Sequence, residues 1–414
     1  MKVEVIGLGY IGLPMACLLA DAGHKVVGVD IDERKIETLR SGKLPFDEPG
    51  LPDLFERVRN KMRFVTKPEP ADVFIIAVPT PFDPETKASD LRYVKSAVES
   101  VLPVLEDGSL VIIESTVTPG TTDGLVRKIL DRAGKKYFLA HAPERAIPGK
   151  TLYEMVHNDR VIGGVDPEST KRAADLYKTF VKGKILETDA TTAELVKLME
   201  NTYRDVNIAL ANEFALIAEE LGVNVWEAIE LANHHPRVNI HRPGPGVGGH
   251  CISVDPWFIT EVTHHAHMIY LAREINDSMP KHVLSLLKRA GVTSGTVAVL
   301  GVAYKGNVDD TRETPALKFI KLAENAGLNV KVHDPHVKEF EYPLLSLEDA
   351  VRGVDVIVLI TDHDVFRDID PEKIAKLTKR KIVIDTRNIL DRERWERAGF
   401  RYIRLGDGQS MRDA

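Results

Sequence analysis

Three glycines near the start of the chain, Gly7, Gly9 and Gly12, constrain its fold more than any other feature. They follow an apolar segment at residues 3–6 and open a stretch rich in Ala and Leu. In a strand–turn–helix unit, the first glycine permits a tight turn, the second lets the backbone approach a pyrophosphate, and the third allows close helix–strand packing. Asp30 ends the next apolar segment, where an acid accepts from ribose hydroxyls and repels a 2′-phosphate. We therefore expect a Rossmann unit that binds NAD rather than NADP.

The rest of the chain shows strand–helix alternation in two separate blocks. Strand-length apolar segments, of the kind that parallel sheets bury on both faces, recur between amphipathic stretches. They lie at residues 3–6, 25–29, 73–78 and 110–113, and again at 296–300, 329–333, 354–360 and 381–385. Between the blocks, residues 191–221 contain no Pro and no Gly, which predicts one long helix. The predicted fold class is α/β, with two Rossmann-like doubly wound domains joined by a central helical domain.

The 414 residues are enough for two or three domains, and the pattern changes give their expected bounds. We expect an NAD-binding Rossmann domain at 1–188, a helical domain at 189–291 and a last α/β domain at 292–414. The net charge of −7, without a basic block, makes nucleic acid and membrane surfaces poor candidates as partners. Only two cysteines are present, and the first strand leaves no room for a signal peptide. These features predict a cytoplasmic protein.

One of the two cysteines, Cys251, lies in a segment that can carry nucleophilic chemistry. It follows four glycines at positions 244, 246, 248 and 249 and precedes Asp255 by four residues. We call residues 244–255 the cysteine loop. Glycines allow backbone N–H groups to approach a substrate closely, and a thiolate near such donors is a strong nucleophile. The other cysteine, Cys17, lies in an Ala- and Leu-rich helix and is expected to be a small buried apolar residue.

Further polar side chains could assist the thiol. Lys197 and Asn201 are four residues apart on the predicted long helix and therefore share a face. A desolvated Lys and an Asn amide can both stabilise an oxyanion. Glu144 follows a predicted strand and could orient or activate a water. Taken singly, each of these residues would more often be ordinary surface charge.

Together these residues give the chain a resemblance to the UDP-glucose/GDP-mannose dehydrogenase family over nearly its whole length. The matching segments are residues 7–14 (GLGYIGLP), 78–81 (VPTP), 114–117 (ESTV), 143–144 (PE), Lys197 with Asn201, the cysteine loop, and 304–315 (YKGNVDDTRETP). The family oxidises a sugar C6 alcohol to a carboxylate with two NAD⁺. The resemblance implies that Cys251 forms a thiohemiacetal and then a thioester.

The resemblance also implies roles for other positions. Lys197 and Asn201 would stabilise the oxyanion, Asp255 would assist proton transfer through water, and Glu144 with Thr116 would position the hydrolytic water. The implied cofactor-binding residues are Gly7, Gly9, Tyr10, Ile11, Gly12, Asp30, Lys35, Pro79, Thr80, Thr116 and Arg312. The implied substrate-binding residues are Glu144, Arg145, Lys197, Asn201, Arg204, Arg237, Gly246, Gly248, Gly249, Tyr304, Lys305 and Arg387, with Arg237 from either subunit of an oligomer.

Two departures from the glucose-oxidising branch bear on the sugar. Val254 stands where that branch usually has Lys, and Arg204 stands where it has an apolar residue. Both are similar to the branch that acts on N-acetylated sugars, so the expected substrate is UDP-N-acetyl-D-mannosamine. UDP-N-acetylglucosamine, which differs at C2, and UDP-glucose stay as alternatives. A two-electron β-hydroxyacid dehydrogenase and a non-catalytic nucleotide-binding regulator are the rival classes, and neither needs the cysteine loop.

Two further expectations concern metals and assembly. His264, His265 and His267 cluster in sequence without an HExxH or CxxC motif, so no metal is expected. A long helix between two domains needs its apolar stripe covered, which predicts a homodimer or higher oligomer. The candidates for that stripe are Leu195, Leu198, Val206, Ile208, Leu210 and Ala215.

Overall fold

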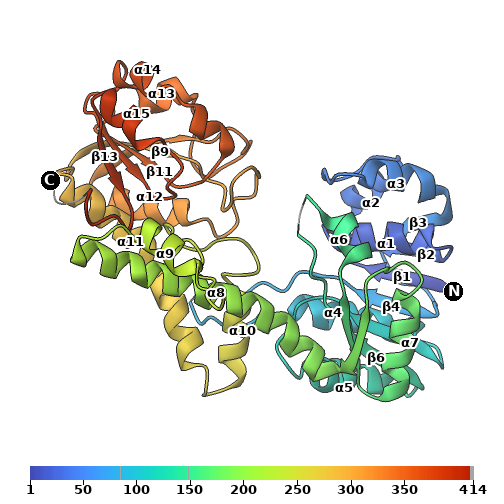
Figure 1. Cartoon of the computed structure of the whole chain (residues 1–414). Helices are drawn as coiled ribbons and strands as arrows, with labels where there is room; N and C mark the ends of the chain where they lie inside the picture. Colours follow the sequence, from blue (N-terminus) through green and yellow to red (C-terminus); the bar gives the residue numbers. More distant parts are fainter. Residues whose placement is uncertain (84, 148, 411–414) are drawn as a thin grey trace. The chain divides into compact units, whose positions relative to one another are not determined.

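The computed structural model describes residues 1–83, 85–147 and 149–410, so the last four residues of the expected 292–414 domain lie outside it. The chain divides into two compact units. Unit 1 comprises residues 1–200 and 257–264, and unit 2 comprises residues 201–256 and 265–414. The boundary falls inside the long helix α8 (Ala190–Leu221), drawn in green in Figure 1.

Unit 1 is built on an eight-stranded sheet with the order β3-β2-β1-β4-β5-β6-β7-β8. The strands are β1 (Lys2–Ile6), β2 (Lys25–Val29), β3 (Met62–Val65), β4 (Val73–Ile76), β5 (Ser109–Ile113), β6 (Tyr137–His141), β7 (Arg160–Gly164) and β8 (Ile185–Asp189). The first six in this order form the parallel Rossmann arrangement, whereas β7 pairs with β6 in the antiparallel direction and with β8 in the parallel one. The sequence had indicated four of these strands.

Helices cover both faces of the first sheet because its strands are apolar on both sides. The helices are α1 (Gly12–Asp21), α2 (Glu33–Arg40), α3 (Leu51–Val58), α4 (Arg92–Val101), α5 (Arg127–Leu130), α6 (Thr151–His157) and α7 (Pro167–Tyr177). One core packs α1, α2, α3, α6 and α7 on residues such as Val5 and Ile75, and a second packs α4 and α5 on Ile6 and Ile76. Cys17 is fully buried in the first core, as expected.

Unit 2 contains a five-stranded parallel sheet with the order β10-β9-β11-β12-β13. Its strands are β9 (Gly295–Leu300), β10 (Leu328–His333), β11 (Val356–Leu359), β12 (Ile382–Asp385) and β13 (Arg401–Arg404). Its helices are α9 (Val225–Asn233), α11 (His267–Arg289), α12 (Pro315–Asn325), α13 (Leu347–Val351), α14 (Pro371–Ala375) and α15 (Arg392–Arg397), while α10 (Asp255–Val262) crosses the unit boundary. This second doubly wound sheet and the helices beside it confirm the predicted fold class.

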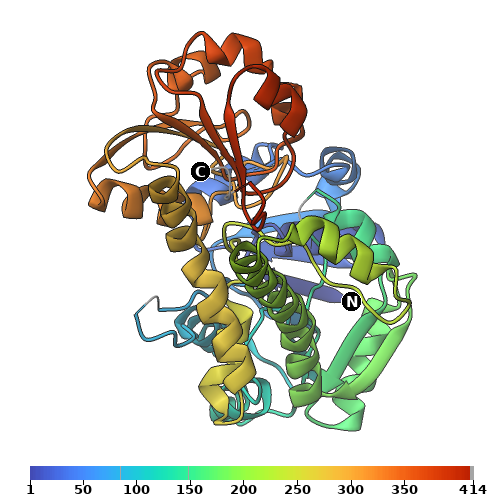
Figure 2. The same ribbon diagram turned by 60° about the vertical axis from the view of Figure 1, so that its left-hand side comes forward.

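The second half of α8 belongs to the core of unit 2. Ala211 and Ala215 of α8 pack with Met279 and Val283 of α11, and Figure 2 shows α11, in gold, running beside α8. Leu198 and Ala215 are fully buried, so their predicted place on an exposed stripe is wrong. Within the described part of the chain, no helix has the length and apolarity needed to cross a bilayer.

Candidate active site

The glycine turn between β1 and α1 has the geometry that a dinucleotide requires. Gly7 has φ of +95°, and a Cβ there would lie 2.4 Å from the carbonyl oxygen of Ala77. A Cβ on Gly12 would lie 1.8 Å from the carbonyl oxygen of Gly7, so this position also needs glycine. Gly9 faces open space, because a Cβ there would meet no atom within 4 Å. The turn is therefore tight at its ends and open in the middle, where a pyrophosphate would approach.

Asp30 connects this turn to the end of β2. Its Oδ2 accepts from the Leu8 backbone N–H at 2.9 Å and from Lys35 Nζ at 2.7 Å, and its Oδ1 accepts from the Asp32 N–H at 3.0 Å. Burial alone would raise the pKa of Asp30, but these hydrogen bonds hold it below its ordinary value. The carboxylate is therefore ionised and retains acceptor capacity on Oδ1. The structure places Lys35, which the resemblance implies for the adenosine ribose, in contact with Asp30.

The segments after β4 and β5 are joined by one hydroxyl. Ser115 Oγ accepts from the Val78 backbone N–H at 2.9 Å and donates to the Val78 carbonyl at 2.7 Å. This bond places Thr116 and the Pro79–Thr80 pair on adjacent segments at the carboxyl edge of the sheet. In doubly wound sheets that edge is where ligands bind.

Glu144 lies in a buried ionic cluster that the sequence did not indicate. Its Oε2 accepts from Arg160 Nη1 at 2.7 Å, and its Oε1 accepts from the Arg145 and Ala146 backbone N–H groups at 2.7 and 2.8 Å. Arg160 Nη2 also donates to Oε1 of Glu114. Burial opposes ionisation of Glu144, but the Arg160 charge and these bonds lower its pKa. A carboxylate held this way is a weak base, which suits orienting a water better than deprotonating it.

The remaining site residues of unit 1 lie on α8 and after β6. Lys197 is 8% exposed, and its charge, together with that of Arg160, acts on the fully buried His141. Burial is the main reason that the pKa of His141 falls to about 3, so this imidazole is neutral. Arg145, a predicted substrate residue, forms an ion pair with Glu200 at 2.5 Å.

In unit 2, the cysteine loop ends in a buried hydrogen bond between two predicted catalytic residues. Asn201 Nδ2 donates to Asp255 Oδ2 at 2.6 Å, and both residues are buried. The Asp255 and Val254 backbone N–H groups donate to the Cys251 carbonyl at 2.8 and 3.1 Å. Cys251 itself is exposed. The turn therefore leaves Cys251 exposed, while Asp255 at its end orients the amide of Asn201.

The glycines of the cysteine loop allow it to pack against the segment that carries Tyr304. A Cβ on Gly248 would lie 2.7 Å from the Glu313 carbonyl oxygen, and one on Gly249 would lie 2.8 Å from the Tyr304 ring. Gly249 also has φ of +83° and donates its N–H to the Arg312 carbonyl at 2.9 Å. Gly246 has φ of +131°, which L side chains rarely adopt. The close approach of these two segments requires glycine at these positions.

Arg387 contacts the start of the same loop from the end of β12. A Cβ on Gly244 would lie 2.7 Å from Arg387 Nη1, and Arg387 Nε donates to the Ile360 carbonyl at 2.9 Å. The Arg387 N–H is held by Asp385 Oδ1 at 2.9 Å, and Asp385 Oδ2 accepts from the Tyr402 hydroxyl at 2.8 Å. Side chains of both β12 and β13 thus shape this turn.

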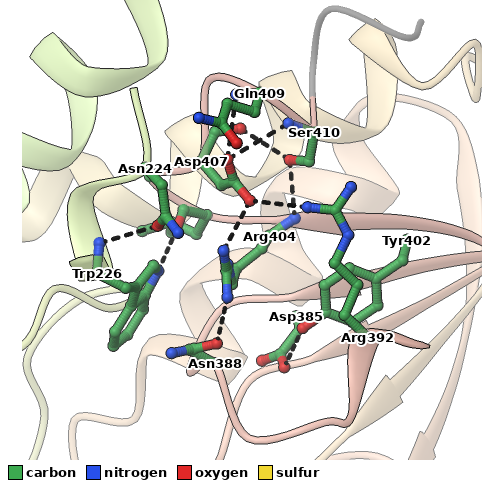
Figure 3. A network of polar contacts seen from close by, with 12 residues as sticks. Asn224, Trp226, Asp385, Asn388, Arg392, Tyr402, Arg404, Asp407, Gln409 and Ser410 are labelled. Carbon is green, nitrogen blue, oxygen red and sulfur yellow. Dashed lines mark hydrogen bonds and ion pairs between the residues drawn. The ribbon is translucent and has the colours of Figure 1, made fainter. Parts of the chain in front are cut away.

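Figure 3 shows how residues 404–410 support that turn. Arg404 donates from Nη1 to Asn388 Oδ1 at 2.7 Å and from Nη2 to the buried Asp407 at 2.8 Å. Trp226 of α9 donates from Nε1 to the Leu405 carbonyl at 2.8 Å. Residues 404–410 therefore connect α9 to the turn that carries Arg387.

The loop that carries Lys305 is held at both ends by residues from other strands. Asp334, after β10, accepts from the Val302 and Ala303 N–H groups at 2.7 and 3.1 Å, and from His363 Nε2 at 3.0 Å. His363 Nδ1 in turn accepts from the Asn307 N–H at 2.9 Å. Asp334 follows the second strand of its sheet, as Asp30 does in unit 1, but its oxygens are occupied by the protein itself.

The other predicted cationic residues of unit 2 are at the surface. Lys305, Arg204, Arg237 and Arg312 are exposed. Arg312 forms a bidentate pair with Asp310, with distances of 2.6 and 3.0 Å. Arg237 lies on the segment after α9, where its N–H donates to His235 Nδ1. Among the described residues, no group of three His, Cys, Asp or Glu side chains could hold a metal ion.

A second polar network in unit 2 was also missed from the sequence. Asn212 of α8 accepts from the Gly244 N–H at 2.8 Å and donates to Asn276 Oδ1 at 2.8 Å. Asn276 donates to Asp205 Oδ1 at 2.8 Å, and this oxygen also accepts from Arg273 Nη1 at 2.6 Å. The only sequence signal was polar side chains within otherwise apolar helical faces, which is too common to be diagnostic.

Comparisons with known proteins agree with this arrangement along the whole chain. The models of the UDP-glucose/GDP-mannose dehydrogenase family match its NAD binding domain at residues 1–181, its central domain at 191–278 and its UDP binding domain at 298–392. The chain belongs to this family. It is thus an NAD-dependent dehydrogenase with an NAD-binding and a UDP-binding domain, as the resemblance had implied.

Individual relatives are similar over nearly their full length. A UDP-N-acetyl-D-mannosamine dehydrogenase of Methanocaldococcus jannaschii is 54% identical over 99% of this chain and 97% of its own. An NDP-N-acetyl-D-galactosaminuronic acid dehydrogenase of Ralstonia solanacearum is 43% identical over 95% of this chain and 97% of its own. The solved UDP-D-ManNAc dehydrogenase of Pyrococcus horikoshii superposes with a TM-score of 0.92 at 44% identity, covering 99% of this chain and 100% of that one.

Proposed function

We propose that this dehydrogenase oxidises the C6 alcohol of UDP-N-acetyl-D-mannosamine to the carboxylate, in four electrons, through a thioester on Cys251. The observation that carries the proposal is the exposed thiol on a glycine-rich turn whose end is fixed by the buried Asn201–Asp255 hydrogen bond. A reaction that stopped at two electrons would not need a nucleophile. The relatives named for the same substrate support the choice of sugar.

NAD⁺, when bound, supplies the oxidant for the two oxidations, from alcohol to aldehyde and from thiohemiacetal to thioester. The glycine turn fits this cofactor because Gly9 leaves open space where Gly7 and Gly12 are tightly packed. The N–H groups at the start of α1 would bind the pyrophosphate, and Asp30 with Lys35 would hold the adenosine ribose. Tyr10, Ile11, Pro79, Thr80 and Thr116 would line the same edge of the sheet, and Arg312 would reach the cofactor.

The covalent steps use Cys251. Its sulfur bonds to C6 of the aldehyde as the carbonyl π bond breaks, and the oxygen takes a proton to give the thiohemiacetal. Asn201 and Lys197 would stabilise the negative charge on this oxygen, and Asp255 would pass protons through water. The second oxidation leaves a thioester. Water then bonds to C6, the C6–S bond breaks, and the products are the carboxylate and the thiol. Glu144 and Thr116 would hold that water.

The substrate would be bound mainly by the second sheet. Lys305 and Arg387 would contact the pyrophosphate and uridine, with Tyr304 packed beside the cysteine loop at Gly249. Arg204 would contact the N-acetyl sugar. We expect the Arg204→Leu substitution to lower kcat/KM for UDP-N-acetyl-D-mannosamine at least about tenfold, the size of one lost charge-assisted hydrogen bond. An unchanged kcat/KM would show that Arg204 does not contribute to recognition of the N-acetyl sugar.

Assembly as a homodimer or higher oligomer through α8 is part of the proposal. Leu195, Met199, Tyr203, Leu210, Phe214 and Ile217 are all at least 37% exposed and follow one face of the helix. An apolar stripe of this length in water favours a covering surface, and a second copy of α8 would supply one. A monomer in light scattering would contradict this assembly. A reactive thiol also suits a reducing cytoplasm, where the uronate product could serve polysaccharide synthesis.

The test is a comparison of UDP-N-acetyl-D-mannosamine, UDP-N-acetylglucosamine and UDP-glucose at saturating NAD⁺. We expect the highest kcat/KM for the first sugar and two NADH for each sugar consumed. One NADH per sugar would show a two-electron dehydrogenase. Binding without NADH formation would show a nucleotide-binding regulator. A higher kcat/KM for UDP-N-acetylglucosamine would show that this sugar, with the other configuration at C2, is the substrate.

A further inference from the structure

A single guanidinium in unit 1 is shared by two carboxylates from different strands. Arg160 begins β7, Glu114 follows β5, and Glu144 follows β6. The side chains of Arg160, Glu114 and Glu144 are 5%, 0% and 8% exposed. Arg160 also donates to the Ala142 carbonyl at 3.2 Å, and its guanidinium carbon lies 4.3 Å from the centre of the Tyr177 ring. Three strand ends and helix α7 thus hold one cation against two acids.

The charges in this cluster do not balance if both acids are ionised. One buried guanidinium can neutralise one carboxylate, and a second buried charge without a partner is costly. Burial raises the pKa of Glu114 to about 8 against the opposing charge of Arg160, whereas the pKa of Glu144 is lowered. At neutral pH the proton therefore resides on Glu114, and Glu144 carries the charge.

The hydrogen bonds of Glu144 use most of its capacity to accept. A carboxylate has about four lone-pair sites, and three of those on Glu144 accept from Arg160 and from the Arg145 and Ala146 N–H groups. About one site remains for a further donor such as a water. Because Arg160 fixes Oε2 while the two N–H groups fix Oε1, the direction of that remaining site depends on Arg160.

We propose that Arg160 is a positioning residue for thioester hydrolysis, and that Glu114 beside it is neutral. The charge of Arg160 is then balanced by Glu144 alone. The proposal rests on the thioester route proposed above and assigns the hydrolytic step its own supporting residues. The hydride-removing steps do not involve this cluster. Loss of the shared guanidinium should therefore slow release of the acid and leave the two oxidations intact.

The first experiment is Arg160→Lys, because a single ammonium cannot bridge two carboxylates as the planar fork does. Mixed rapidly with NAD⁺ and UDP-N-acetyl-D-mannosamine, this variant should release two NADH per active site at the wild-type rate. Its steady turnover should then fall at least about tenfold, as expected for a lost charge-assisted bond. Intact-mass measurement should show the acyl adduct on Cys251.

The matched control is Arg172→Lys. Arg172 also forms an ion pair with one glutamate, Glu168, and also lies over an aromatic ring, that of Phe138, but it is exposed on α7. We expect it to behave as wild type. If Arg160→Lys turns over at the wild-type rate without an adduct while wild type releases two NADH per sugar, the inference is wrong and the thioester route stands. If wild type releases one NADH per sugar, the proposed function itself is wrong, because a two-electron reaction forms no thioester.

The second experiment, Glu114→Gln, covers the case in which Arg160→Lys does not fold. Gln imitates the protonated acid and cannot ionise. The charged and titratable groups around Glu114 are Arg160 from β7, Glu144 from the β6 loop and Tyr177 from α7. Arg160 also acts on His141 at the end of β6, as does Lys197 of α8. In wild type, Glu114 ionises near pH 8 and then competes with Glu144 for Arg160.

The expected result is a ratio that changes with pH. The hydrolysis rate of Glu114→Gln divided by that of wild type should be near one at pH 6.5–7 and should rise several-fold by about pH 9, one unit above the Glu114 pKa of about 8. If the substitution acted only through the structure of the protein, the ratio of the two hydrolysis rates would be the same at every pH. A ratio that is independent of pH would overturn the assignment of Glu114.

Discussion

Asn201 and Asp255 are joined by a 2.6 Å hydrogen bond although 54 residues separate them in the chain. The amide donates and the carboxylate accepts, and both residues are buried. The bond fixes which end of the Asn201 amide faces the aspartate. It also connects α8 to the last residue of the cysteine loop, four positions after the thiol that we propose as nucleophile.

Replacing Asn201 by Asp should therefore damage catalysis without changing the side-chain volume. Two carboxylates at this distance cannot both ionise, so one should bind a proton with a raised pKa. We expect kcat to fall about 10²–10³-fold, the range for a lost oxyanion-hole donor, and the remaining activity to depend more steeply on pH. Steady-state kinetics between pH 6 and 9 measures both effects.

The control for this substitution is Asn325→Asp at the exposed end of α12, which should leave kcat unchanged. If Asn201→Asp keeps kcat within twofold of wild type, neither the amide nor its bond to Asp255 contributes to the reaction.

The two cysteines should react very differently with iodoacetamide. Cys17 is fully buried, and burial raises the pKa of its thiol to about 12. Cys251 is exposed. Native protein should therefore take up one label per chain, on Cys251, with loss of activity, and Cys251→Ser should take up none. Peptide mass mapping checks this, and labelling of Cys17 in the folded protein would contradict the buried position.

The fold was largely predictable because its signals are local. The glycine turn, Asp30 and the strands before and after it follow from residues close together in sequence, and the structure confirms that arrangement. The clusters around Arg160 and Asn212 depend on which strand and helix ends meet, which no local pattern encodes. The exposed stripe on α8 was only partly predicted, because burial of Leu198 and Ala215 is set by packing partners distant in sequence.

The buried pair between Arg273 and Asp205 should contribute strongly to stability. The two side chains are 1% and 0% exposed and lie 2.6 Å apart. The Arg273→Met substitution leaves the carboxylate in the core without its cation, so we expect the free energy of unfolding to fall by about 3–5 kcal/mol. Arg397→Met, which removes an exposed ion pair with Glu393, should cost less than about 1 kcal/mol. Urea unfolding of both variants tests the difference, and equal effects would contradict it.

Asp334 should affect nucleotide-sugar binding and leave NAD binding unchanged. It holds the backbone of Val302 and Ala303 and the ring of His363, which fixes the loop that carries Lys305. Asp334 accepts three donors on Oδ2 and the His336 and Val337 N–H groups on Oδ1, and the Asp334→Asn substitution leaves a neutral amide with only one acceptor oxygen. We expect KM for the UDP-sugar to rise about tenfold, with the Kd for NAD⁺ within twofold of wild type.

The matched control is Asp368→Asn, an exposed aspartate of the same unit, which should leave both constants unchanged. An Asp334→Asn variant that weakens NAD⁺ and UDP-sugar binding equally would indicate general destabilisation of the protein instead of a role in the Lys305 loop.

The central claim is that the acid forms through a thioester on Cys251, and carboxylate formation by Cys251→Ser tests it most directly. Wild type and variant are incubated with NAD⁺ and UDP-N-acetyl-D-mannosamine, and NADH and uronate are counted together. The account predicts two NADH and one uronate per sugar for wild type, and uronate formation reduced at least about 10³-fold for the variant, as for loss of a catalytic nucleophile. Wild-type uronate turnover by Cys251→Ser would contradict it.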